Sequence, residues 1–138
     1  MALVAASAGC VSPARSEASY QGKAMSAVRS AAANVATGLL VVQQDRAKKV
    51  FSAYADDVVS ASETSMGSIT ESFGSVQPPD RRSDGIRDSV TDVLSKAQDA
   101  LSHARIAVRR SDGRALAESE DELKAVAQAL DTTERELG

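Results

Sequence analysis

Aromatic residues are nearly absent from this chain of 138 residues, which has no tryptophan, two tyrosines and two phenylalanines. Its apolar content of 43% therefore comes largely from alanine and from aliphatic side chains. Alanine is the strongest intrinsic helix former, because it loses no side-chain entropy in a helix and buries no polar group. We expect closely packed helices that bury little area per residue, and thus an ordered fold of modest stability.

The chain has one cysteine, Cys10, and one histidine, His103. A single cysteine excludes an intrachain disulfide. A di-metal carboxylate bundle needs a Glu-x-x-His on each of two helices, so we interpret His103 as a surface residue rather than a metal ligand beside Asp99. The sequence also has no Gly-rich phosphate loop, Cys-x-x-Cys or Gly-x-Ser-x-Gly. It therefore predicts no catalytic residue, no metal site, no cofactor and no enzymatic activity.

Strong net charge and long apolar runs are missing as well. The formal net charge is −3, whereas a general nucleic-acid binder normally carries a basic surface, so we expect no nucleic-acid partner. The densest apolar run covers only residues 38–42, far short of the roughly 20 residues that cross a bilayer. We therefore expect no membrane-spanning helix.

Apolar residues recur at steps of three and four along four segments, at about residues 17–46, 53–76, 81–110 and 113–137. That spacing places them on one face of a helix. Breaks at Gln77-Pro78-Pro79-Asp80 and at Ser111-Asp112-Gly113 separate the last three segments, and we expect Ser52 to cap the second. Short connections between amphipathic helices predict an all-α, antiparallel up-down-up-down four-helix bundle over residues 17–138, with a flexible N-terminal tail.

The second segment is the least regular of the four. It is rich in serine and threonine, which compete for backbone hydrogen bonds, and it contains Gly67 and Gly74. We interpret these glycines as sites of close packing against alanine-rich neighbours, with a frayed or partly irregular segment as the alternative.

Basic residues gather around the first and third connections, which lie at the same end of an antiparallel bundle, opposite both termini. Phe51 and Tyr54 are nearby in the sequence. Such a cluster could dock an acidic protein partner or polyanion. It could equally serve only to complement the helix dipoles and to cap free carbonyl groups at the helix ends. The candidate docking residues are Arg46, Lys48, Lys49, Arg109, Arg110 and Arg114.

The first residues are apolar and small and lead to Ser7-Ala8-Gly9-Cys10. This stretch resembles the lipobox that ends the signal peptide of small bacterial lipoproteins, and the alanine-rich helical body resembles such proteins too. The resemblance implies cleavage before Cys10 and attachment of a diacylglycerol to its sulfur, with small residues at Ala8 and Gly9 suiting the peptidase. Residues 1–16 would then be a remnant signal and tether.

Together these features predict a non-enzymatic bundle, anchored through lipidated Cys10 at the outer face of a membrane, that serves as an interaction, sensing or scaffold module. The alternative is a cytoplasmic helical adaptor that self-associates through exposed heptad faces, and a homo-oligomer is compatible with either interpretation.

Overall fold

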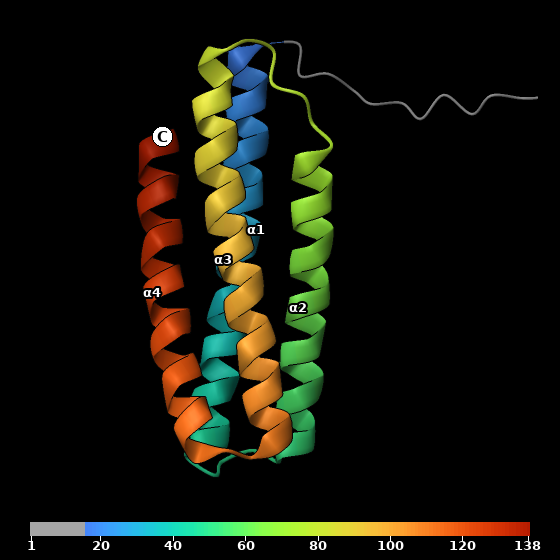
Figure 1. Cartoon of the computed structure of the whole chain (residues 1–138), viewed down its shortest axis with the longest axis vertical. Helices are drawn as coiled ribbons and strands as arrows, with labels where there is room; N and C mark the ends of the chain where they lie inside the picture. Colours follow the sequence, from blue (N-terminus) through green and yellow to red (C-terminus); the bar gives the residue numbers. More distant parts are fainter. Residues whose placement is uncertain (1–15) are drawn as a thin grey trace, which may run out of the picture.

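The computed structural model describes residues 16–138, which form four helices and their connections (Figure 1). The helices are α1 (Glu17–Arg46), α2 (Ser52–Gly74), α3 (Arg82–Arg110) and α4 (Gly113–Leu137). They run antiparallel in sequence order and confirm the predicted all-α, up-down-up-down bundle. The predicted flexible tail lies outside the described residues.

Side chains mark the helix starts where the sequence has suitable oxygens. The Ser16 hydroxyl accepts a hydrogen bond from the Ser19 amide at the start of α1. The Asp112 carboxylate accepts from two amides of the first turn of α4, at 3.0 and 3.1 Å. Asp80 accepts from the Ser83 amide at 3.0 Å, and this bond lowers the pKa of its carboxyl group. These bonds satisfy amides that have no partner inside the helix.

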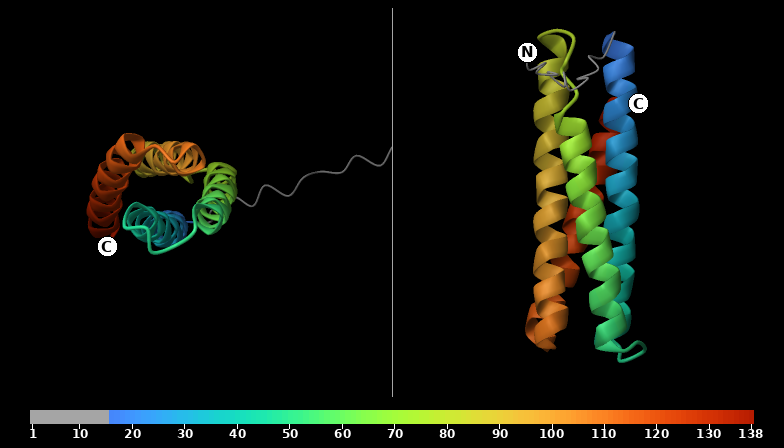
Figure 2. Two further views of the ribbon diagram at one scale, coloured as in Figure 1. Left: turned by 90° about the horizontal axis from the view of Figure 1, so that it is seen from below. Right: turned by 90° about the vertical axis from the view of Figure 1, so that its right-hand side faces the viewer.

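The four helices do not form a square. Viewed along the bundle, α1 and α3 face each other across a short diagonal and touch, whereas α2 and α4 lie on opposite sides (Figure 2). Helices α1 and α3 therefore contact all the others, and α2 and α4 do not contact each other. The core lies along the α1–α3 seam.

Small residues make this short diagonal possible. On α3, four buried alanines recur at steps of three and four, and on α1 the buried Gly38 lies against Leu101. A Cβ atom at Gly38 would lie 2.5 Å from Cδ2 of Leu101, so the leucine side chain occupies the space that a side chain at position 38 would need. The four alanines are Ala97, Ala100, Ala104 and Ala107.

The predicted heptad faces are largely confirmed, with one systematic difference on α1. In the α1 series at steps of three and four, Val28, Val35 and Val42 are buried. The alternate members Met25, Ala32 and Leu39 are only partly buried. The buried face of α1 instead extends to a second set of residues, because this helix packs against three neighbours. That set is Tyr20, Ala24, Ala31, Gly38, Val41 and Asp45.

Both interpretations of the glycines in the second segment are wrong. Helix α2 is continuous from Ser52 to Gly74, which contradicts a frayed segment. A Cβ atom at Gly67 would meet only Gln98, at 3.9 Å, and one at Gly74 would meet nothing within 4 Å. These glycines therefore do not mediate close packing.

The expectation that no helix could cross a membrane rested on the length of uninterrupted apolar runs, and this criterion was too strict for α1. Within the described residues, this helix is long and apolar enough, by length and composition alone, to cross a membrane. Such a composition also suits the core helix of a bundle, and α1 contacts all three other helices here.

Candidate functional site

The connections α1–α2 and α3–α4 meet at one end of the bundle, opposite the end where α1 begins (Figure 1). This confirms the predicted placement of both connections, and we call this end the distal end. At 1.5 Å per residue, the 30 residues of α1 separate it from Ser16 by about 45 Å.

Half of the predicted basic cluster is neutralised by carboxylates. Arg46 pairs with Glu120, Arg109 pairs with Asp56 at 2.8 Å, and Arg114 pairs with Glu118 at 2.8 Å. Within residues 16–138, the other three have no carboxylate oxygen within 4.0 Å, and they are exposed. The three are Lys48, Lys49 and Arg110.

Glu120 on α4 is buried, although it stands among Glu118, Asp121 and Glu122 in the sequence. Its carboxylate accepts hydrogen bonds from Lys124, Arg46 and Gln43. The Lys124 ammonium, supported by the other two donors and opposed by desolvation, lowers the pKa of Glu120 to about 2. This carboxylate links α4 to α1, which is a structural role.

The end of α1 has a well-defined backbone conformation. The Lys49 amide donates to the Gln44 carbonyl and the Lys48 amide donates to the Asp45 carbonyl, both at 2.9 Å. This pair of bonds is the Schellman motif, and it places Lys48 in the left-handed region with φ of 56°. A glycine usually occupies that position, because a side chain there is strained.

Phe51, and not Ser52, precedes the first residue of α2, so the predicted cap is wrong. The Ser52 hydroxyl instead donates to the Asp45 carboxylate at 2.8 Å, which links the end of α1 to the start of α2. Phe51 provides no capping hydrogen bond, and its side chain is 87% exposed. Tyr54, one turn into α2, is 58% exposed.

His103 lies on the surface of α3, where Nδ1 is 3.0 Å from a carboxylate oxygen of Glu122 on α4. Asp99 and Glu122 line the same shallow groove as His103, between α3 and α4. Among residues 16–138, no group of three or more His, Cys, Asp or Glu side chains is arranged to hold a metal ion. The interaction resembles an ordinary surface pair between neighbouring helices.

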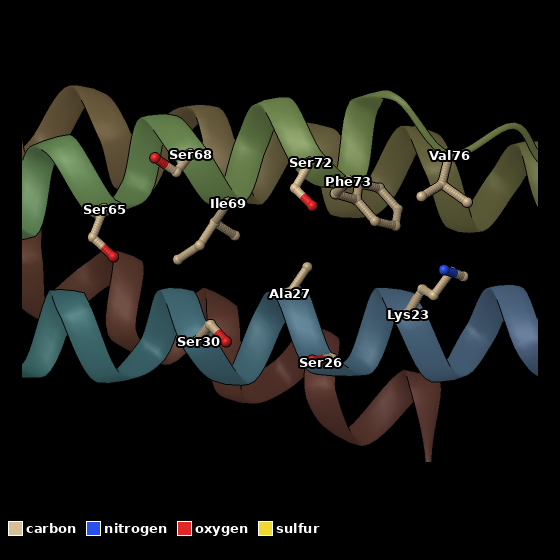
Figure 3. Close-up of a pocket in the computed structure, with 10 residues that line it drawn as sticks. All are labelled: Lys23, Ser26, Ala27, Ser30, Ser65, Ser68, Ile69, Ser72, Phe73 and Val76. Atoms are coloured by element: carbon tan, nitrogen blue, oxygen red, sulfur yellow. The ribbon is translucent and has the colours of Figure 1, made fainter. Parts of the chain in front are cut away.

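A groove of about 450 Å³ that the sequence did not predict runs between α1 and α2 (Figure 3). Its floor is apolar, with Ala27, Ile69 and Phe73 pointing between the helices. Five serines, Lys23 and Val76 line the rest. The serine-rich character of residues 60–75 was visible in the sequence, but periodicity alone could not show that these side chains leave a groove. The five serines are Ser26, Ser30, Ser65, Ser68 and Ser72.

The lipidation site predicted at Cys10 lies outside the described residues. No protein-family model matches the chain, and neither curated proteins nor solved structures give a match.

Proposed function

We propose that the chain is a non-enzymatic helical bundle, anchored at the outer face of a membrane through a lipid on Cys10, and that it acts as an interaction or scaffold module. The observation that carries the proposal is the contrast between its ends. The N-terminal segment that bears Cys10 joins the bundle at Ser16, and the distal end exposes Phe51 beside Lys48 and Lys49. Exposed aromatic and cationic groups suit contact with an anionic partner.

The distances support this arrangement. Only five residues separate Cys10 from Ser16, so the tether would hold the near end of the bundle close to the membrane. The rest of the bundle would extend up to about 45 Å from there. An interaction surface at the distal end would then be accessible to partners away from the anchoring membrane.

The pairing of charged side chains within the chain supports a structural role for the helical bundle. The carboxylate with the most strongly lowered pKa among the described residues, Glu120, is engaged by three donors from its own chain. Arg105 is likewise engaged by Glu63, which raises the pKa of the arginine. These groups stabilise contacts between helices. The heptad faces are buried against one another, which favours this proposal over self-association through exposed heptad faces.

Cell fractionation tests the anchor. Expressed in a bacterium that processes lipoproteins, the chain is expected in the membrane fraction and to stay there after a high-salt wash. Cys10→Ser should move it to the soluble fraction, and Ser12→Ala serves as a control that leaves the cysteine in place. A Cys10→Ser chain that remains in the salt-washed membrane would contradict the proposal.

A further inference from the structure

The α1–α2 connection presents four neighbouring side chains to solvent, which we call the Phe51 tip: Lys48, Lys49, Phe51 and Tyr54. Phe51 is the most exposed large apolar residue among those described. Neither lysine has a carboxylate oxygen of residues 16–138 within 4.0 Å, although Arg46 and Arg109, at the same end, are paired. The tip therefore combines apolar surface with positive charge that its own chain leaves unpaired.

Two residues of the tip are of types that are usually disfavoured at their backbone positions. Lys48 adopts a left-handed conformation that favours glycine, and Phe51 occupies a helix N-cap without supplying an oxygen. Neither choice is explained by burial, because both side chains are exposed. Local choices that cost stability without a packing gain tend to mark functional positions.

The tip is an ordered protrusion rather than a cleft. The two Schellman hydrogen bonds and the Ser52–Asp45 bond fix its backbone. The grooves between α1 and α2 and between α3 and α4 are lined by other residues. The tip would therefore insert into or lie against a partner's surface, because it cannot enclose a ligand.

We propose that the Phe51 tip binds the surface of an anionic lipid bilayer. Phe51 and Tyr54 would enter the boundary between headgroups and acyl chains, with Lys48 and Lys49 on the lipid phosphates. Aromatic rings and lysines beside them are the groups that partition to such an interface. Among the neighbouring carboxylates, Asp45 is buried, Asp56 is paired with Arg109, and Asp112 caps α4. Asp57 on α2 is exposed without an ion-pair partner among residues 16–138, and Arg110, equally without one, adds a cation at the same end, so the tip keeps an excess of positive charge.

A bilayer fits the tip better than an acidic protein does. A stable protein interface involves about 20–30 residues on each side, whereas the tip offers four. A fluid bilayer supplies apolar and anionic groups together and needs no pocket of complementary shape. The inference names the partner of the interaction surface in the proposed function and rests on that part of it, but it does not depend on the lipid at Cys10. If both hold, the bundle would join two membrane surfaces spaced by about the length of α1.

The absence of tryptophan allows a direct test. In the full chain, produced without lipid and kept reduced, Phe51→Trp places a single tryptophan at the tip. Its emission should shift to the blue on vesicles of phosphatidylglycerol mixed with phosphatidylcholine, and brominated lipids should quench it. Leu40→Trp, on the exposed side of α1, is the control and should show neither effect.

Charge variants measure the electrostatic part by vesicle co-sedimentation. Each lysine near an anionic surface changes the partition coefficient about fivefold, so Lys48→Gln with Lys49→Gln should weaken binding about 25-fold. Lys23→Gln with Arg87→Gln removes the same charge from exposed positions at the other end and should leave binding nearly unchanged. Helix content from circular dichroism verifies that each variant folds.

Binding that needs phosphatidylglycerol, falls with salt and is lost only in the tip variants would support the inference. Absence of vesicle binding by the folded chain, or equal loss in both double variants, would overturn it and leave an acidic protein as the partner class. Because no step requires Cys10, failure here is distinguishable from failure of the anchor.

Discussion

Replacing Gly38 by alanine tests the α1–α3 seam most sharply. The added Cβ atom would lie 2.5 Å from Cδ2 of Leu101, a fully buried side chain. The displaced methyl group has to move into other core atoms, since protein interiors are close-packed. Gly22 on the same helix is the matched control, because a Cβ atom there meets nothing within 4 Å.

The expected magnitudes follow from two opposing effects. An alanine in a helix interior is favoured over glycine by about 1 kcal/mol, so Gly22→Ala should raise the free energy of unfolding by up to that amount. Overpacking costs about 1–3 kcal/mol, so Gly38→Ala should be neutral or lower the free energy of unfolding by up to about 2 kcal/mol.

Urea unfolding followed by circular dichroism measures both variants, and a double-mutant cycle identifies the cause. Leu101→Ala alone should cost about 2–5 kcal/mol, and adding Gly38→Ala to it should recover part of that loss. If Gly38→Ala stabilised the protein as much as Gly22→Ala does, helices α1 and α3 would not be in contact at this position and the short diagonal would be refuted.

Three further predictions concern single side chains. Lys48→Gly and Ser111→Gly should each stabilise the bundle by about 1 kcal/mol, because both residues adopt a left-handed conformation at a helix end, and an unchanged urea midpoint would contradict this. Glu120 should contribute about 1–2 kcal/mol, discounted for its exposed partners. Since its pKa of about 2 lies below the ordinary 4.5, that contribution is present above pH 4.5 and is lost as the pH falls toward 2, and Glu120→Gln should remove this part of the acid dependence. Tyr20→Phe should raise the melting temperature, because the buried hydroxyl has no hydrogen-bond partner among the described residues and its burial raises the pKa of the phenol. A lower melting temperature would contradict this and would mean that the Tyr20 hydroxyl does have a hydrogen-bond partner.

The helix boundaries were predictable because local chemistry determines them. Pro78 disfavours helical geometry in the residue before it, and Asp112 can cap the helix that follows it. The ends of the predicted segments therefore differ from those of the helices by no more than two residues. The start of α2 shows the limit of this reasoning. Ser52 has the chemistry of a cap, but its hydroxyl donates to the carboxylate of Asp45 instead.

Contacts between helices were less predictable. Periodicity identifies the buried face of a helix but not how many neighbours it meets, so the wider buried face of α1 was missed. Glu120 reads as solvent-exposed from its position among other acidic residues, and only the approach of Arg46 and Gln43 from α1 explains its burial. The same limit applied at the distal end, where the sequence predicted the cluster of cations but not which of them would be paired.

The mass of the mature chain is the most direct test of the central claim, that a lipid on Cys10 holds this bundle at a membrane. Intact-mass spectrometry of the protein made in a lipoprotein-processing bacterium should show a chain that begins at Cys10 and carries a diacylglycerol. A chain with an intact N-terminal segment and an unmodified Cys10 would contradict the account.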